Sequence, residues 1–280
     1  MKAIFKVVLF LVFPLSIWGD YLFVLYDAGE TVALEPVIEA LQKRGEEVEV
    51  LRYGMKGRYE ELSLEELSDA DVVVTGTASK IQLQHIQHAQ GKTVAYYDNA
   101  LPIETLSYAL LIREFEEAAD LFLVPSQVAS ASSHAKHVEV VGNPDLDRYQ
   151  GSEMQKGVLT YFGGYDPDYE AAFRAFLNYV APLEYQVVVR PHPKTDGSLE
   201  KKLIEGMPNI SLGDPHLSAV EAVAQSEMIV CHRSSMAVKA AAAGKKVLCI
   251  DAEGRITYPP SREELGIPSD ATERIVSFLL

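Results

Sequence analysis

Short apolar runs alternate with amphipathic segments along most of the chain. Residues 21–25 (YLFVL) are apolar throughout, as in a strand buried on both faces, and 31–45 repeats apolar residues at helical spacing up to a glycine. The same pattern predicts further strands over 47–54, 71–77, 92–99, 120–126 and 137–144, and helices over 62–70, 79–90 and 103–118. Strands that alternate with helices are typical of a parallel, doubly wound sheet, so an α/β fold is predicted.

A segment rich in Gly, Pro and polar residues, 142–157, interrupts this alternation and is the best candidate for a domain boundary. After it the pattern restarts, with helices predicted over 168–180, 198–207, 217–225, 234–243 and 271–280. We therefore expect two Rossmann-like α/β domains that face each other across a central cleft. The first comprises residues 20–143, the linker 144–156, and the second 157–280.

The first 19 residues have a different pattern. Two lysines precede an apolar run over residues 7–18, which is short for a membrane span and typical of a signal-peptide core. The residues before position 20 depart from the small residues that a cleavage site prefers, so an uncleaved signal anchor is an alternative. We expect an exported protein (periplasmic or secreted), or one held peripherally at a membrane by this segment, at the cytoplasmic face if the segment is retained.

The net charge limits the classes of ligand that the protein can bind. A formal net charge of −15, spread along the chain, repels nucleic acid, so polynucleotide binding is excluded as a main function. A negatively charged ligand then requires a local basic or dipolar site. The two cysteines lie at the ends of apolar runs, and no Cys/His spacing is typical of a zinc site. We therefore predict no metal.

The loops that follow strands are the first places to look for a site, because ligands of open parallel sheets lie at the carboxyl ends of strands. In VVVRPHPKTD, both Arg190 and His192 precede a proline, which biases them to extended conformations and stiffens the loop. A rigidly held imidazole with Arg190 and Lys194 beside it suits a phosphate or a departing diphosphate, and makes His192 a catalytic candidate. The alternative is a proline-rich turn with a surface histidine.

A second basic loop precedes the helix predicted over 234–243. Ser234 or Ser235 is placed to cap that helix. The same helix start can instead present its N–H groups, hydroxyls and positive dipole end to a phosphate, with His232 and Arg233 adding donors. Both interpretations stay open.

Two glycines, Gly163 and Gly164, follow the first strand of the second half. They either let the backbone approach a ligand closely or turn the chain. In the first half, Asp27 and Glu30 follow one strand, while Asp98 and Glu104 follow another. A transfer reaction draws its general base from such a carboxylate, and Asp27 and Glu30 are our candidates. The alternatives are a helix cap and a solvated charge.

These stretches resemble a known family. VEVVGNPDLDRY resembles the end of the N-terminal domain in GT-B glycosyltransferases and their UDP-GlcNAc 2-epimerase-like relatives. RPHP followed by HRSSMAVKAAAAGKKVLCID resembles the HP and SS motifs of a subset that includes bacterial sialyltransferases, teichoic-acid glycerophosphotransferases and capsule Kdo-transferases. The pattern covers most of residues 21–280, with motif identity in about three short stretches. The resemblance implies a GT-B fold, with an acceptor-side first domain and a donor- and phosphate-binding second domain.

The resemblance also implies roles for single residues. His192 would contact the donor phosphate or assist the leaving group, and Ser234 and Ser235 would hold the donor phosphate. Many GT-B enzymes place a glutamate five or so positions later to bind the donor ribose, but Lys239 stands there in this chain. Lysine cannot accept hydrogen bonds from ribose hydroxyls. It would reach a phosphate instead, or mark a site that no longer uses a nucleotide.

The function implied is a metal-independent glycosyltransferase that moves a sugar from a nucleotide-activated donor to an envelope glycan or lipid. It needs no cofactor, because the nucleotide-sugar is its substrate. One alternative is a non-catalytic exported protein that keeps the GT-B shell to bind a glycan or a phosphorylated ligand. The other is an epimerase-like enzyme of sugar nucleotides. Since activated sugars of this family are cytosolic, an anchored enzyme at the cytoplasmic face would reconcile the N-terminal segment with the activity.

Overall fold

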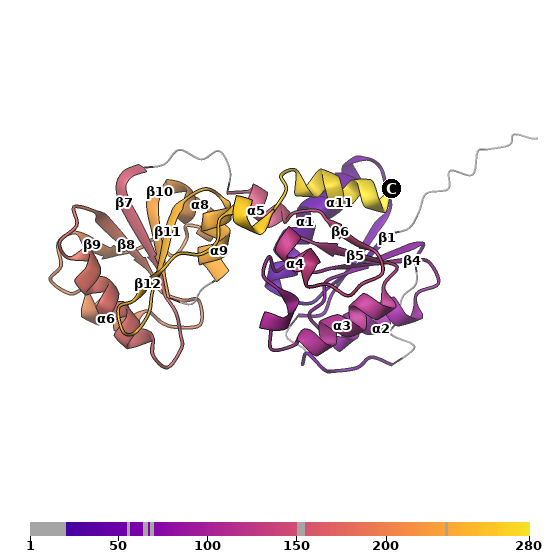
Figure 1. Ribbon diagram of the computed structural model, residues 1–280, viewed down its shortest axis with the longest axis horizontal. Helices are drawn as coiled ribbons and strands as arrows, with labels where there is room; N and C mark the ends of the chain where they lie inside the picture. Colours follow the sequence, from indigo (N-terminus) through magenta and orange to yellow (C-terminus); the bar gives the residue numbers. More distant parts are fainter. Residues whose placement is uncertain (1–20, 55–56, 64–66, 68–69, 150–154, 233–234) are drawn as a thin grey trace, which may run out of the picture.

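The computed structural model describes residues 21–280 except 55–56, 64–66, 68–69, 150–154 and 233–234. The signal-like segment 1–19 and most of the helix predicted over 62–70 lie outside the described residues. In the rest, two sheets lie side by side in separate domains (Figure 1).

The first domain is built on a parallel six-stranded sheet of order β2-β1-β3-β4-β5-β6. Its strands are β1 (Tyr21–Leu25), β2 (Val48–Arg52), β3 (Val72–Thr75), β4 (Lys92–Tyr96), β5 (Leu121–Val124) and β6 (Val138–Val140). Its helical segments are α1 (Ala28–Lys43), α2 (Lys80–His88), the 3-10 turn η2 (Ile103–Thr105), α3 (Ala109–Ala118), α4 (Gln127–Ala131) and α5 (Pro144–Asp147).

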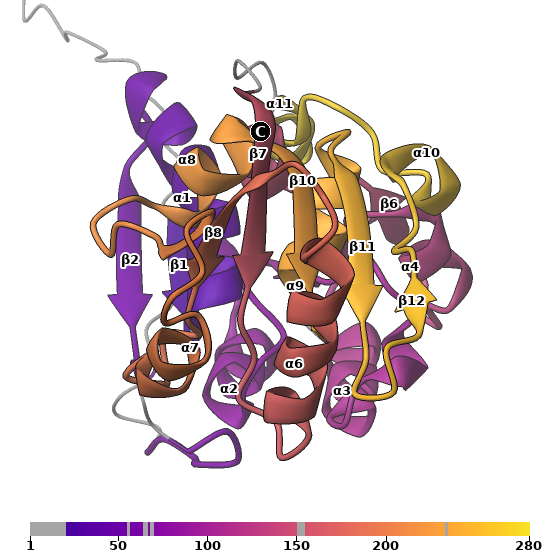
Figure 2. The same cartoon turned by 90° about the vertical axis from the view of Figure 1, so that its left-hand side faces the viewer.

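The second domain has a six-stranded sheet of order β12-β11-β10-β7-β8-β9, parallel except for the antiparallel β12. Its strands are β7 (Gln155–Phe162), β8 (Gln186–Arg190), β9 (Ile210–Leu212), β10 (Ser226–Cys231), β11 (Lys246–Ile250) and β12 (Ile256–Thr257). The helices after β7 are α6 (Tyr169–Val180), α7 (Ser198–Leu203), α8 (Ala219–Gln225), α9 (Ser235–Ala242), α10 (Arg262–Leu265) and α11 (Ala271–Leu279). Figure 2 shows α6 lying over β7, β10 and β11.

Each sheet is buried on both faces, and β1 shows why its residues are all apolar. Successive side chains of a strand point to opposite faces. Phe23 therefore packs with α1 on one face, while Leu22 and Val24 pack with α2 and α3 on the other. A strand covered on both sides has no polar face, so the uninterrupted run YLFVL is what a central strand requires.

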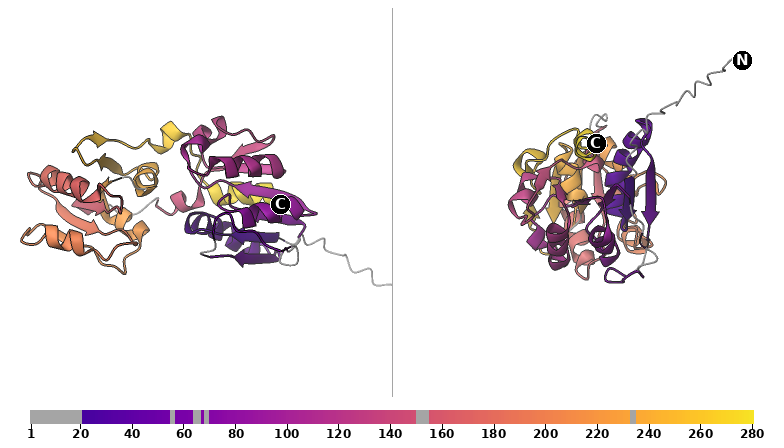
Figure 3. Two further views of the ribbon diagram at one scale, coloured as in Figure 1. Left: turned by 90° about the horizontal axis from the view of Figure 1, so that it is seen from below. Right: turned by 90° about the vertical axis from the view of Figure 1, so that its right-hand side faces the viewer.

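The last helix does not lie where we predicted it. The chain leaves the second domain after β12, passes through α10, and places α11 against α1 of the first domain (Figures 1 and 3). Ile275, Val276 and Leu279 are fully or almost fully buried in the first domain's core, and Arg44 pairs with Glu273 at 2.5 Å. The assignment of residues 271–280 to the second domain was therefore wrong. The apolar face of α11 was visible in the sequence, but the surface it covers was not.

The chain therefore crosses between the domains twice, and the two crossings meet. A small apolar cluster at the junction combines residues of both domains, among them Ala100, Leu146, Ala242 and Leu265. The predicted linker contains α5 rather than a continuous loop, and β7 already begins at position 155. Among the described residues, no helix is long and apolar enough to cross a membrane.

Candidate functional site

A cavity of about 440 Å³ lies at the junction of the two domains. Its walls are the loops after β1, β4 and β6 at the carboxyl edge of the first sheet, together with α9 of the second domain. The residues that line it are Asp27, Gly29, Asp98, Asn99, Ala100, Leu101, Tyr108, Asn143, Leu146, Val238 and Lys239. This junction cavity lies where ligands of parallel sheets bind.

The two carboxylates predicted as general bases have different positions. Asp27 lines the junction cavity and caps α1, accepting hydrogen bonds from Gly29 N (2.9 Å) and Glu30 N (3.2 Å). Glu30 is 2% exposed behind the wall, where its carboxyl accepts from the Tyr26 N–H and from Gln82 Nε2. Burial, and next the Asp27 charge, raise the pKa of Glu30 well above its ordinary value. Asp27 can therefore meet a ligand in the cavity, while Glu30 supports the loop from below.

Asp98, which follows β4 and Tyr97, has an unusual pKa among the carboxylates that line the junction cavity. Its half-buried carboxylate packs directly on Gly29, where any Cβ would overlap it. Burial raises the pKa of Asp98 to about 6; the nearby Asp27 charge adds to the rise and Lys239 opposes it. The sequence placed Asp98 after a strand, but it could not show the burial, or the neighbouring Asp27 carboxylate, that raise its pKa.

Lys239 also lies in the junction cavity, and it pairs there with Asp145. Its Nζ is 2.5 Å from Asp145 Oδ2, and the Asp145 side chain is only 3% exposed. Lys239 therefore neutralises a buried carboxylate on α5 and links the second domain to the linker. Neither Arg190 nor His192 lines this cavity, so the structure does not bring Lys239 together with the predicted phosphate-binding loop.

That loop borders a second cavity, of about 500 Å³, at the carboxyl ends of β8 and β9. His192 is half-buried, with Nδ1 facing the Lys194 N–H at 3.1 Å and its ring 4.5 Å from that of Tyr165. Burial, and next the Lys194 charge, lower the pKa of His192. Since Nδ1 accepts, the neutral ring carries its proton on Nε2 and can donate it. The side chain of Arg190 is held by the Leu217 carbonyl at 2.5 Å.

Gly163 and Gly164 lie between this loop and α6. A Cβ on Gly163 would come within 2.7 Å of the Tyr169 hydroxyl, and one on Gly164 within 3.1 Å of the Tyr169 ring. At Gly163 the overlap forces a shift, while at Gly164 the contact is only tight, because both lie against a buried tyrosine whose hydroxyl donates to Glu200 (2.7 Å). The predicted contact of these glycines with a ligand stays a prediction.

The other residues predicted to bind phosphate, apart from Lys239, are Arg233, Ser234 and Ser235. Arg233 and Ser234 lie outside the described residues, as does the side chain of Ser235, the first residue of α9. Within the described part of the chain, no three His, Cys, Asp or Glu side chains are grouped so that they could hold a metal ion.

Comparison with known proteins identifies the fold. No protein-family model and no curated protein sequence matches the chain. Among solved structures, MnaA of S. aureus with UDP matches with a TM-score of 0.61 and 15% identity, over 93% of this chain and 88% of that one. UDP-GlcNAc 2-epimerase of Neisseria meningitidis bound to UDP-GlcNAc matches with a TM-score of 0.60 and 15% identity, over 93% and 90%. The wall teichoic acid polymerase TagF matches with a TM-score of 0.53 and 10% identity, over 81% and 69%.

These likenesses confirm the predicted fold: the chain has two Rossmann-like α/β domains in the GT-B arrangement. At identities of 10–15% they describe the fold and not the reaction.

Proposed function

We propose that this chain is an enzyme of nucleotide-activated sugars, and that it transfers the sugar to a hydroxyl of an envelope glycan or lipid without a metal ion. The observation that carries the proposal is Asp98 in the junction cavity, a half-buried carboxylate with a pKa raised to about 6. The solved structures with the same fold include proteins described with UDP and with UDP-GlcNAc, which supports a nucleotide-sugar as the donor.

Asp98 fits the role of general base. A base works best when its pKa lies near the working pH, because it is then ionised and still takes up a proton readily. In the proposed step the Asp98 carboxylate takes the proton of the acceptor hydroxyl, while the hydroxyl oxygen forms a bond to the anomeric carbon of the donor sugar. The bond from that carbon to the phosphate oxygen breaks, and its electron pair leaves with the nucleotide. Burial raises the pKa of Asp98, and the charge of Asp27 beside it adds to the rise.

The leaving nucleotide needs cationic or donating groups. Arg190, His192 and Lys194 are grouped at the carboxyl end of β8, and His192 has a proton on Nε2 available for the departing oxygen. In this proposal the sugar is held in the junction cavity and the donor phosphates extend toward the β8 loop.

A second candidate is an epimerase of sugar nucleotides. It is favoured by the fold likeness to UDP-GlcNAc 2-epimerase. The same carboxylate, Asp98, would then exchange a proton with the sugar itself instead of with an acceptor hydroxyl.

Product analysis separates the candidates. The protein is incubated with UDP-, CMP- and CDP-activated donors, with and without glycan or lipid acceptors, and sugars and nucleotides are resolved by NMR. A transferase releases nucleotide in step with acceptor modification, whereas an epimerase yields the epimeric sugar nucleotide without an acceptor. Asp98→Asn abolishes either reaction, while Glu39→Gln on the exposed surface of α1 leaves it unchanged. Binding without turnover would favour the non-catalytic alternative. If no donor binds, the proposal fails.

A further inference from the structure

Tyr165, in the loop between β7 and α6, lies against the ring of His192. The two ring centroids are 4.5 Å apart, and the ring planes are inclined at 48° to each other. The Nζ atom of Lys194 lies 4.5 Å from the centroid of the same tyrosine ring and 3.5 Å from its hydroxyl oxygen. Tyr165 therefore contacts two basic side chains that lie two positions apart in the loop after β8.

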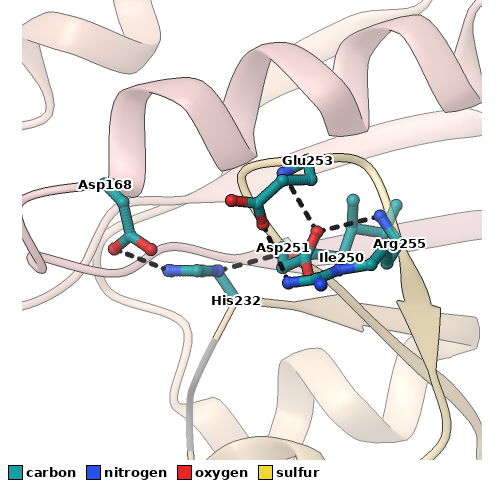
Figure 4. A network of polar contacts seen from close by, with 6 residues as sticks. All are labelled: Asp168, His232, Ile250, Asp251, Glu253 and Arg255. Atoms are coloured by element: carbon teal, nitrogen blue, oxygen red, sulfur yellow. Dashed lines mark hydrogen bonds and ion pairs between the residues drawn. The ribbon is translucent and has the colours of Figure 1, made fainter.

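The loop that carries Tyr165 is attached to the sheet at both ends. At its start, the Gly163 N–H donates to the Arg190 carbonyl at 2.9 Å, which joins the loop to the end of β8. At its end, a carboxylate oxygen of Asp168 lies 3.3 Å from Nε2 of the buried His232 (Figure 4). The other ring nitrogen of that histidine faces a backbone carbonyl at the end of β11, at 3.2 Å. These contacts keep a short loop, and the tyrosine within it, beside the end of β8.

The imidazole of His192 needs a restraint that its own loop does not supply. The prolines on both sides of His192 restrict its backbone, but they leave the rotation of its side chain free. Nδ1 faces the Lys194 N–H at 3.1 Å, so the neutral ring carries its proton on Nε2 while that contact lasts. The ring of Tyr165 packs against the imidazole from a different loop, and this packing opposes a rotation that would break the contact of Nδ1.

We propose that Tyr165 is a positioning residue, whose ring holds the imidazole of His192 so that its Nε2–H is presented to the cavity at the carboxyl ends of β8 and β9. Lys194 stabilises the arrangement, because its ammonium group is attracted to the face of the tyrosine ring. In the proposed reaction, the hydrogen on Nε2 is the one available for the departing oxygen. The catalytic consequence therefore rests on the proposed function, whereas the placement of the imidazole does not.

The groups around the imidazole allow its placement to be measured. Burial, and next the Lys194 charge, lower the pKa of His192, while Asp166, the residue after Tyr165, acts in the opposite direction. Removing the Tyr165 ring exposes the imidazole to water and releases the Lys194 side chain. Both changes raise the pKa of His192 towards its ordinary value, so this pKa reports whether the imidazole is still held.

Heteronuclear NMR of the histidine-labelled protein measures this pKa and the tautomer without any ligand. In Tyr165→Ala, the pKa of His192 should rise, and the proton of the neutral ring should be shared between Nδ1 and Nε2. Tyr165→Phe keeps the ring and should match the unaltered protein. Lys194→Met removes the charge and should raise the pKa of His192 while the proton stays on Nε2.

Tyr258→Ala is the matched control. Tyr258 and Tyr165 are both exposed, at 75% and 55%, so neither replacement removes a core residue. Tyr258 follows β12, at the opposite edge of the sheet from β8 and β9, and its loss should leave the pKa and the tautomer of His192 unchanged. The positioning role is refuted if Tyr165→Ala changes neither property, or if Tyr165→Phe changes them as much as Tyr165→Ala does.

The kinetic consequence is tested on whichever donor the protein turns over. Tyr165→Ala should lower kcat about tenfold with little change in KM, and Tyr165→Phe should restore it, because a displaced proton donor weakens the chemical step more than binding. An unchanged kcat in Tyr165→Ala would refute the catalytic consequence. If no donor is turned over, the proposed function fails, and the NMR measurements still decide whether Tyr165 positions His192.

Discussion

The ion pair between Lys239 and Asp145 offers a sharp test of how the two domains are joined. Replacing Lys239 by Met keeps most of the side chain's apolar length and removes its charge. Asp145, with a side chain only 3% exposed, then loses the amine 2.5 Å away and keeps Arg148 at 3.8 Å. The carboxylate is left buried with a weaker partner, and the folded protein must be destabilised.

The magnitude follows from burial. Breaking a fully buried pair costs about 3–5 kcal/mol, whereas an exposed pair contributes about 0–1 kcal/mol. Because the Lys239 side chain is 27% exposed, the pair falls between these limits. We expect Lys239→Met to lower the free energy of unfolding by about 1–3 kcal/mol.

Urea unfolding followed by circular dichroism measures the change. Lys43→Met is the matched control, because Lys43 and its partner Glu39 have side chains 77% and 60% exposed. The control should change the free energy of unfolding by less than about 0.5 kcal/mol. The double variant Lys239→Met with Asp145→Asn should recover most of the loss, since no buried unpaired charge remains and Arg148, which loses its contact with Asp145, is 48% exposed. Equal losses in Lys239→Met and Lys43→Met would refute the reasoning.

Four further predictions concern the first domain. The raised pKa of Asp98 means that its ionisation opposes folding, so stability falls as pH rises from about 4 to about 6, and urea unfolding of Asp98→Asn should lack this fall. In the proposed reaction kcat/KM should rise with pH through about 6 and then level off. Glu30→Gln should be tolerated at acid pH and be more stable than the unaltered protein at higher pH, because burial raises the pKa of Glu30 and the introduced amide oxygen still accepts from the Tyr26 N–H. Urea midpoints of both proteins at the two pH values test this, and an equal change of midpoint with pH in the two proteins would contradict it. Gly76→Ala should lower the free energy of unfolding by about 1–3 kcal/mol, because the new Cβ overlaps the Glu30 carboxyl, whereas the Cβ of Gly57→Ala meets no atom within 4 Å. Equal melting temperatures for the two variants would show that the overlap has no effect on stability.

Much of the fold could be read from local pattern. The alternation of apolar runs and amphipathic segments predicted two Rossmann-like domains, and the comparisons confirm that fold. The helix predicted over 103–118 was less accurate, because Leu106 is extended and separates η2 from α3. An apolar period persists across such a break, so periodicity alone does not reveal it.

The candidate site was only partly visible in the sequence. Asp27 and Asp98 could each be placed after a strand, but the elevated pKa of Asp98 depends on its burial and on Asp27, a carboxylate from a different loop. His232 could be seen as a donor near a helix start, but Asp168 and Ile250 come beside it only when β7, β10 and β11 are assembled.

By itself, the sequence determined most of the segments that form strands and helices, because the periodicity of a segment and the residues at its ends act over a few neighbouring positions. It also predicts a stiff loop at Arg190 and His192, since each residue precedes a proline. The tertiary structure alone decided that α11 covers the first domain and that Lys239 neutralises Asp145. An apolar face or a charged side chain requires a partner of a certain kind, but many residues of the chain are of that kind. The packing of the chain decides which of them it contacts.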